Sequence, residues 1–499
     1  MKRKQTAFDY VYRDLCEQMQ VGRLACGDTL ASMSQLCELY HVGIRTIKDV
    51  MRALREDGYI RTEERKPAVV IYRRSEERRD AAVQAALRQR TSILQVYETM
   101  ALLLPQMAAL SAAACDDGKM EEWVRRFRNF EKKDAERRKK LMAALLYFLM
   151  EHSGNLLFRD LYATYELYAK IPLFLNGEKF ESRVVRYNGF RSLTGMVEAL
   201  LARDGGQIVS HFSIMYAAIV ATVRTLLEEL AAEHPDVPED PEPGFAWNAQ
   251  RGRDYFYLQI ARDLMDKIGA GVYPEDTFLP AEAALASAYG VCVATVRNAL
   301  AMLNALGVAK TCNAKGTRVI RLEEQAVARC LRDRALKRDA LLYLSALQLM
   351  AVAAPAAAER ALPAAREAAL RELPGRLADP AWIPLDPVTR CIAAHQPLEP
   401  LGTILRELCG FNLWGYYGVL HRDGLVQDAV LAERSREAAF ALCGGDARRA
   451  ADCLGFCYRR MLASAQAFLV RCGLPEAGIL AVPGAPRGPG GAGAGESRP

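Results

Sequence analysis

The sequence predicts a mainly α-helical chain with two winged helix-turn-helix domains. Each is built of three helices plus a β-hairpin wing, and each is followed by an all-α helical bundle. Two observations lead to this prediction. Residues 40–60 (YHVGIRTIKDVMRALREDGYI) align without a gap with residues 289–309 (YGVCVATVRNALAMLNALGVA), 249 residues further along the chain. A repeat this long indicates one module used twice. The Ala- and Leu-rich stretches after each copy carry almost no strand or turn signal, which is typical of helical bundles.

The length of 499 residues is too large for one hydrophobic core and predicts several domains. The acidic residues 234–244 contain four Pro and predict a semi-extended linker that packs poorly. The low-complexity residues 483–499 predict disorder. The expected division is a first winged helix at 1–75, an effector or oligomerisation bundle at 76–233, a linker at 234–249, a second winged helix at 250–323, a second bundle at 324–475 and a disordered tail at 476–499.

The first winged helix is predicted from hydrophobic spacing. Apolar residues from Phe8 to Met19 recur at helical intervals, and a short second helix should follow near residues 33–40. The third helix should start near Arg45 and end before Gly58, with Ile47, Val50, Met51 and Leu54 on its apolar face. The β-rich residues 59–62 and 69–72 should form the wing.

The opposite face of this third helix is basic, and segment 1–75 holds 14 Lys plus Arg against 10 Asp plus Glu. A helix fits the major groove of DNA, where Arg donates to guanine and Thr contacts bases or phosphates. Alternatively, these charges form only a solvated helix face. The turn, the wing and the repeat favour DNA contacts from the helix and wing: Arg45, Thr46, Lys48, Arg52, Arg65 and Lys66.

The second copy offers a different set of DNA-contacting candidates. At the start of its third helix, Ala294 stands where the first copy has Arg45, so the charged base-reading residue is lost. Its wing keeps groups suited to phosphate contacts, which position a protein without specifying sequence. The candidates are Thr295, Arg297, Asn298, Lys315, Gly316 and Arg318. We therefore expect an asymmetric operator, or two half-sites of unequal stringency.

The block from Tyr40 to Gly58 together with the wing resembles the winged-helix domain of the GntR family of bacterial transcriptional regulators. Residues 271–282 (GVYPEDTFLPAE) resemble that family's G-x-x-x-x-G-x-x-L-P-S-E signature, with Glu275-Asp276 where Gly-Asp is usual. The first copy departs from it, because residues 30–33 (LASM) lack both the Pro and the Glu. The resemblance implies operator binding by the winged helices and an effector domain joined to them.

Three fragments resemble the all-α FCD effector domain of the same family: residues 150–157, 199–207 and 441–450. The positions that hold that domain's metal ligands fall on Met142, Leu146, Met215 and Cys457, so we expect no metal. A small-molecule pocket could use polar tips along one helix: Asn155, Arg159, Tyr162 and Tyr165. Alternatively, these aromatic residues simply pack.

The thirteen scattered Cys suit a reducing cytoplasm, and residues 1–9 lack the apolar run of a signal peptide. Residues 340–358 are uncharged and almost long enough to span a bilayer, but their Ala content favours a buried helix. We expect no membrane contact. Since no nucleophile–base set or phosphate loop occurs, we expect no enzymatic activity and no cofactor.

The favoured hypothesis is a cytoplasmic, one-component bacterial regulator that binds double-stranded operator DNA and is controlled by a small-molecule effector. Pairing of two chains into a homodimer through the helical domains stays open. The alternative is a scaffold or interaction protein, in which the second winged helix and both bundles mediate oligomerisation rather than DNA or ligand binding.

Overall fold

The structure is a computed structural model that describes most of the chain. The described residues are 7–20, 24, 26–40, 42–63, 66–72, 83–84, 86–126, 135–168, 183–184, 194–240, 245–249, 256–269, 272–305, 307–313, 315–320, 328, 331–332, 334–362, 364–372, 385–412 and 428–484. Helices dominate these residues, which confirms the mainly α prediction.

The N-terminal unit, residues 7–72, consists of three helices followed by an antiparallel strand pair. Its elements are α1 (Ala7–Gln20), α2 (Met33–Tyr40), α3 (Ile44–Glu56), β1 (Ile60–Arg61) and β2 (Val69–Val70). α3 buries Ile47, Val50 and Leu54, as the helical spacing predicted. Just after the helix, Gly58 has a φ of +73°, a left-handed conformation that glycine adopts at low cost.

The second unit, residues 256–320, repeats these elements. They are α12 (Phe256–Gly269), α13 (Glu282–Tyr289), α14 (Val293–Ala305), β3 (Ala309–Cys312) and β4 (Gly316–Val319). Each helix begins and ends 249 residues after its counterpart. The strand register follows the same shift, since Ile60 pairs with Val70 and Ala309 with Val319. The two units therefore share one backbone arrangement.

The backbone turn before α13 corrects the reading of the signature. Asp276 has a φ of +65°, and its counterpart in the N-terminal unit is Gly27, with a φ of +97°. Asp276 rather than Glu275 therefore occupies the left-handed position for which glycine is best suited.

The first helical region follows the N-terminal unit. Its described helices include α5 (Arg90–Ala114), α6 (Asp117–Arg126), α7 (Ala135–Glu151), α8 (Phe158–Tyr168), α10 (Thr194–Ala202) and α11 (Gly205–Glu233). Residues 194–232 are helical by period, but the structure divides them into two helices, α10 and α11. Arg203 has a φ of +55°, and the Asp204 side chain accepts a hydrogen bond from the Gln207 N–H (3.0 Å), which starts a new helix.

The second helical region follows the second unit and ends in a short 3₁₀ helix. Its described elements include α16 (Arg334–Ala361), α17 (Ala364–Glu372), α19 (Leu385–Ala394), α20 (Glu399–Asn412), α23 (Ala429–Gly444), α24 (Ala447–Arg471) and η3 (Pro475–Ile479). The disordered tail predicted from residue 476 is therefore corrected. Ala477 and Leu480 are buried, and the Ala481 carbonyl accepts a hydrogen bond from Gln348 Nε2 (2.6 Å). Residues 485–499 lie outside the described part.

The predicted linker packs against the molecule at both of its described ends, contrary to the expectation of poor packing. Glu239 pairs with Arg90 at 3.1 Å. Phe245 and Trp247 are buried, and the Trp247 indole N–H donates to Asp160 Oδ2 at 2.7 Å. Two large aromatic side chains after the Pro-rich stretch bury enough apolar surface to dock the segment. We call residues 245–249 the docked strap.

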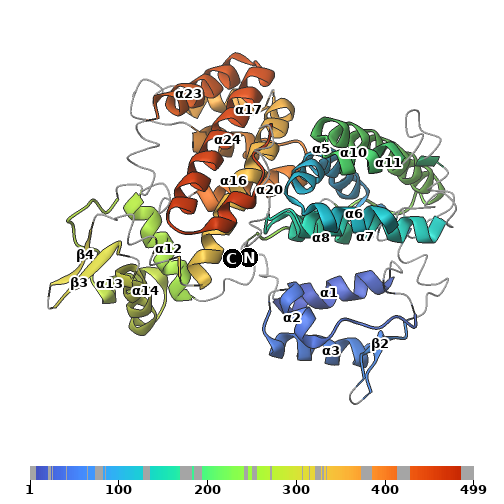
Figure 1. The fold of residues 1–499 in the computed structure, drawn as a ribbon, viewed down its shortest axis with the longest axis horizontal. Helices are drawn as coiled ribbons and strands as arrows, with labels where there is room; N and C mark the ends of the chain where they lie inside the picture. The colour runs from blue at the N-terminus through green and yellow to red at the C-terminus, as the bar shows by residue number, and fades with distance from the viewer. Residues whose placement is uncertain are drawn as a thin grey trace, which may run out of the picture.

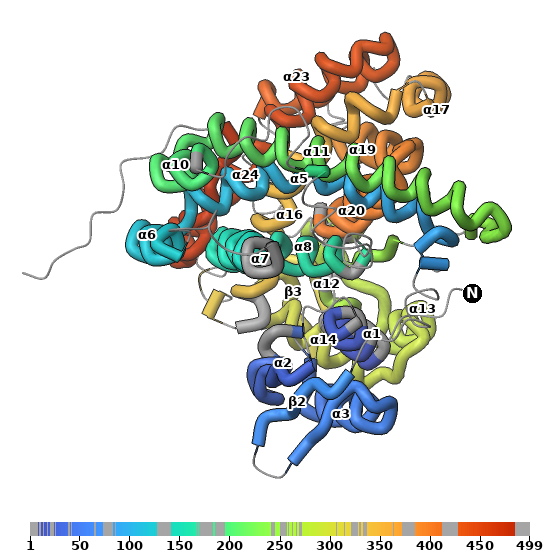
Figure 2. Tube along the Cα trace, turned by 90° about the vertical axis from the view of Figure 1, so that its right-hand side faces the viewer, coloured from blue at the N-terminus to red at the C-terminus, as the bar shows by residue number. Residues whose placement is uncertain are grey.

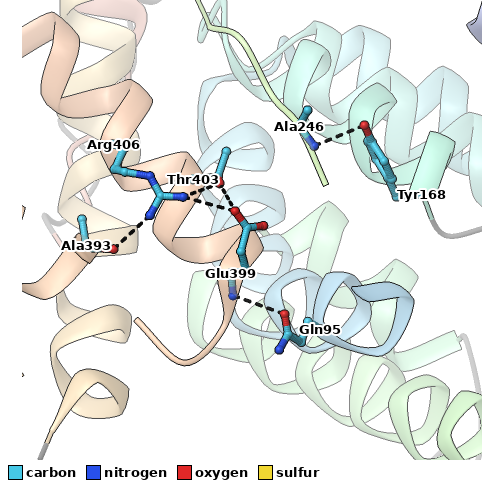
Figure 3. A network of polar contacts seen from close by, with 7 residues as sticks. All are labelled: Gln95, Tyr168, Ala246, Ala393, Glu399, Thr403 and Arg406. Carbon is cyan, nitrogen blue, oxygen red and sulfur yellow. Dashed lines mark hydrogen bonds and ion pairs between the residues drawn. The ribbon is translucent and has the colours of Figure 1, made fainter. Parts of the chain in front are cut away.

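The two helical regions meet through reciprocal hydrogen bonds. The Leu156 N–H donates to Ser345 Oγ (3.0 Å), and the Glu399 N–H donates to Gln95 Oε1 (3.3 Å; Figure 3). The two acceptors hold matching positions in their helices. Ser345 lies ten residues before the internal Pro355 of α16, and Gln95 lies ten residues before the internal Pro105 of α5. In a two-fold interface, each contact occurs twice, with the two partners exchanged between the halves. Here both halves belong to one chain.

The N-terminal and second units lie on the same side of the helical regions (Figures 1 and 2). In Figure 1, α1 and α12 are the helices nearer to the helical regions, while α3 and α14 lie farther from them. The arrangement leaves the third helix of each unit at the periphery.

Three helices in the described part of the chain are long and apolar enough to cross a membrane: Arg90–Ala114, Gly205–Glu233 and Lys337–Ala361. Taken as one span, the bent pair α13 and α14 would be a fourth. Burial of the apolar window is 83% for the last of the three, 61% for α5 and 39% for α11. Helix packing therefore accounts for the apolar character of α16 and much of α5. The expectation of no membrane contact stays a prediction.

Candidate nucleic-acid interface

α3 of the N-terminal unit presents an exposed basic face. Arg45, Lys48, Arg52 and Arg55 are exposed, while the opposite face forms the unit's core. Arg52 lies 3.4 Å from Asp49, an exposed pair worth little in water. Among the described residues neither Arg45 nor Lys48 forms an ion pair. Both side chains can therefore reach an anionic partner without first breaking an internal contact. Thr46, beside Arg45, is half-buried.

The wing of this unit carries further cations. Lys66 lies 2.8 Å from Glu63, and Arg61 lies 3.4 Å from the same carboxylate, with all three side chains largely exposed. Sequence reasoning did not single out Arg61, although its place next to the predicted wing loop could have indicated it. The predicted contact Arg65 lies outside the described residues.

α14 of the second unit presents a nearly neutral face. Arg297 donates to Glu282 Oε2 at 2.7 Å, so the cation predicted to contact DNA is already paired within the unit. The counterpart of Glu282 in the N-terminal unit is Met33, which explains why Lys48 has no equivalent acid. Asn298 is exposed and Thr295 is half-buried.

An exposed thiol begins α14. Cys292 Sγ lies 3.2 Å from Thr295 Oγ1. The hydrogen bond from Thr295 and the backbone N–H groups at the helix start lower the pKa of the Cys292 thiol. The corresponding residue of the N-terminal unit is Gly43.

The second wing holds three cations, of which Lys310 in β3 is exposed and was not among the predicted contacts. Lys315 is exposed next to Gly316, which has a φ of +105°. Arg318 lies 3.4 Å from Asp276 and is partly buried. Phe278 is exposed beside Gly316. Of the three predicted cations of this unit, Arg297 and Arg318 are paired, whereas Lys315 forms no ion pair with a described residue.

Comparison with known proteins identifies this unit. Residues 256–319 match the model of the bacterial regulatory proteins of the gntR family. The match runs from the first residue of α12 to the last residue of β4. The chain thus contains a gntR-family helix-turn-helix domain, and such a domain implies DNA binding in bacterial transcriptional regulation.

Among solved structures, the chain is similar to one described as Streptococcus agalactiae GntR. It has a TM-score of 0.20 and 14% sequence identity, and the match covers 44% of this chain and 99% of that chain. No curated protein matches this chain.

The predicted effector residues lie in three different surroundings. Asn155 is buried and fully engaged. Its Nδ2 donates to Gln348 Oε1 (2.7 Å) and to the Ser345 carbonyl (3.0 Å), while its Oδ1 accepts from the Leu157 N–H (2.8 Å). It therefore joins the two helical regions. Arg159 lies 3.8 Å from Glu151 at the surface.

Tyr162 and Tyr165 instead belong to a buried cluster, which we call the tyrosine centre. It comprises Tyr97, Tyr147, Tyr162, Tyr165, Tyr216 and Glu166. The hydroxyls of Tyr147 and Tyr162 donate to the two oxygens of Glu166, at 2.8 and 2.7 Å. The buried Tyr165 hydroxyl has no hydrogen-bond partner in the described structure. Spacing found two of these tyrosines, but Tyr97 and Tyr216 come from α5 and α11, far away in sequence.

Burial keeps the phenols of the tyrosine centre protonated. It raises the pKa of Tyr97, Tyr162, Tyr165 and Tyr216 well above that of a free phenol, and the nearby Glu166 carboxylate raises three of these values further. The phenols therefore stay protonated and can donate hydrogen bonds throughout the physiological pH range.

The described part of the second helical region has apolar residues at the places equivalent to Tyr165 and Glu166. His152 and His395 hold equivalent places, since each ring Nδ1 lies 2.9 Å from the carbonyl four residues earlier. Tyr165 and Glu166 lie 13 and 14 residues after His152. The residues at the same distances after His395 are Leu408 and Cys409. The two halves share helices but differ in the polarity of their interiors. Among the described residues, no group of three or more His, Cys, Asp or Glu is placed to hold a metal.

Proposed function

We propose that this protein is a sequence-specific transcriptional regulator whose two winged helix-turn-helix units read two half-sites of one operator. The proposed domains are those expected from the sequence, except that the strap at 245–249 and residues 476–484 pack with the helical regions. α3 and the first wing bind one half-site through Arg45, Thr46, Lys48, Arg52, Arg65 and Lys66. α14 and the second wing bind the other through Thr295, Asn298, Lys315, Gly316 and Arg318.

One observation carries the proposal. The gntR-family domain at residues 256–319 has a counterpart in the N-terminal unit, with the same helix bounds and strand register 249 residues earlier. The N-terminal unit also keeps the basic third helix that groove binding requires. A module that matches a DNA-binding family in one copy supports the same role for the other.

The reciprocal contacts between the helical regions support a pseudo-dimer within one chain. Dimeric helix-turn-helix proteins set the spacing of half-sites by the rigid contact between subunits. Here Leu156–Ser345 and Glu399–Gln95 supply the equivalent contact. Both units lie on one side of the joined helical regions, as two readers of a single duplex must (Figure 1).

We further propose that a small-molecule effector acts through the tyrosine centre in the cytoplasm, without enzymatic turnover. The Tyr165 ring lies 6.1 Å from that of Phe245 in the docked strap, which leads to the second unit. The Phe245 ring lies 5.1 Å from that of Tyr168, which also packs against the core of the N-terminal unit. The Tyr168 hydroxyl accepts from the Ala246 N–H at 3.2 Å (Figure 3). A change at the tyrosine centre can thus reach both units through packed side chains.

Selection of bound sequences from random DNA by the purified full chain tests this function. We expect two half-sites of different sequence at a fixed spacing, with one chain bound per duplex. Recovery of no preferred sequence, or of a single half-site, would overturn the two-reader proposal.

Arg45→Ala tests the N-terminal reader. It should weaken specific binding by roughly 1–3 kcal/mol and relax the base preference of one half-site only, because Arg45 is an exposed donor with no ion pair among the described residues. The measurement is affinity for operators varied in either half-site. Arg297→Ala, in the other unit, is the control and should leave the first half-site's preferences unchanged.

A further inference from the structure

The start of each third helix holds the residues best placed to meet base edges. In α3 the exposed residue at the second position is Arg45, and in α14 it is Ala294. The helix bounds and strand register of the two units coincide, so these two side chains hold equivalent places. One unit presents a long cationic donor there, and the other presents a methyl group.

The remaining cation of α14, Arg297, does not take the place of the lost arginine, because it lies one turn further along the helix and pairs with Glu282. Arg297 Nε is held 2.7 Å from Glu282 Oε2. The Thr295 hydroxyl is engaged with the Cys292 thiol at 3.2 Å. The groups left at the exposed surface of the helix start are the Ala294 methyl and the Asn298 amide, which is exposed one turn later.

These two groups match one kind of base pair. The thymine C5-methyl is the only apolar group on the major-groove edge, and small apolar side chains such as Ala contact it. The amide of Asn can bond adenine N6 and N7 at once, whereas guanine is best read by the paired donors of Arg. A reader with Ala and Asn but no unpaired Arg is therefore suited to A·T pairs.

We propose that the second unit reads A·T pairs, with Ala294 on a thymine methyl and Asn298 on an adenine, while the N-terminal unit reads G·C through Arg45. This inference rests on the proposed function, since it assigns the base specificity of the proposed second reader. The inference specifies how the two half-sites differ: one is recognised through A·T pairs and the other through G·C pairs.

The experiment replaces single thymines of the selected operator by deoxyuridine, which removes only the C5-methyl. The half-site whose preferences Arg45→Ala relaxes is assigned to the N-terminal unit, and the other to the second unit. At one thymine of the second half-site, affinity should fall about fourfold, which corresponds to ~0.8 kcal/mol for one buried methyl-sized group. The same replacement in the first half-site should change affinity little.

Variants of the full chain connect the effect to the named residues. Ala294→Gly should abolish the difference between thymine and deoxyuridine, and Asn298→Ala should relax the preference for adenine about fivefold or more. Glu282→Met, which introduces the residue found at the equivalent Met33, frees Arg297. It should strengthen binding to all sequences while keeping the thymine effect.

The outcomes separate this inference from the proposed function. Two half-sites with a G·C preference in the second, or equal affinity for thymine and deoxyuridine at every position there, overturn the inference and leave the two-reader function standing. Absence of any second half-site overturns the two-reader function itself.

Discussion

Single side-chain interactions repeat across the two units as faithfully as the helices do. Tyr40 donates to Asp14, and Tyr289 donates to Asp263, 249 residues later. Burial and the bond to Asp263 raise the pKa of Tyr289 to about 12. Because each hydrogen bond ties the second helix of a unit to the first, the position of the third helix depends on it indirectly.

At the residue scale, the left-handed turn before α2 gives a stability prediction. Gly27→Ala places a Cβ on a residue with a φ of +97°, so it should lower the free energy of unfolding of the N-terminal unit by about 1–2 kcal/mol. Hydrogen exchange of the α1 and α3 amides in the full chain measures this, because the unit has a hydrophobic core of its own.

Gly43→Ala is the matched control for this prediction. Gly43 has a φ of −71°, and no atom lies within 4 Å of the site of an added Cβ. Gly43 is the N-cap of α3, where Ala is a poorer cap than Gly, so the cost of Gly43→Ala should be below about 1 kcal/mol. Equal losses in the two variants would show that the turn at Gly27 carries no conformational penalty.

At the scale of elements, sequence reasoning was most accurate where one amphipathic helix packs on its neighbours. The buried face of α3 and the site of both wings follow from spacing and glycine alone. The interruption at Arg203 was missed because residues 191–232 are helical by period throughout. It is set by Asp204, whose side chain caps the new helix, and by Arg203, which pairs with Asp117 at 2.9 Å.

The start of α23 gives a pH prediction at this scale. Burial of Asp428 raises its pKa, but hydrogen bonds from Arg460 and from the Leu431 N–H outweigh burial and leave the pKa below its ordinary value. A carboxylate with a lowered pKa stabilises the folded state above its unfolded pKa of about 3.9, and that stability is lost as the pH falls through the lower folded pKa.

Asp428→Asn should therefore lower the free energy of unfolding by about 1 kcal/mol at pH 7 and flatten its decline between about pH 5 and pH 3. Urea unfolding across this range measures the effect. Asp446→Asn is the control, because Asp446 caps α24 through the Arg449 N–H (3.0 Å) and Asn caps a helix equally well. An unchanged acid slope in Asp428→Asn would contradict the assignment.

At the scale of the whole molecule, one polar junction couples the two halves. Asn155 contacts Ser345 and Gln348 from about 190 residues away, in a buried setting. A second contact between the halves, from the Glu399 N–H to Gln95, is more exposed than Asn155 (Figure 3). Buried unsatisfied groups cost far more than exposed ones, so the two contacts should contribute unequally to stability.

Asn155→Ala should lower the free energy of unfolding by about 1–3 kcal/mol, whereas Gln95→Ala should cost less than about 1 kcal/mol. In the proposed pseudo-dimer the junction sets the spacing of the two units, so Asn155→Ala should also weaken binding to the full operator more than binding to an isolated half-site. Denaturant unfolding and titration with both DNA lengths provide the measurements. Equal loss on both DNAs would indicate that the junction does not set the spacing.

The sequence by itself determined what depends on local spacing and on the internal repeat. These are the two units, their third helices, their wings and the loss of Arg45's counterpart at Ala294. The tertiary structure alone decided which partners meet. It paired Arg297 with Glu282, joined the two helical regions through Asn155, docked Phe245 and Trp247, and brought Tyr97 and Tyr216 near Glu166. Periodicity identifies the face a residue occupies, but contacts between distant segments depend on how helices pack, which no local pattern encodes.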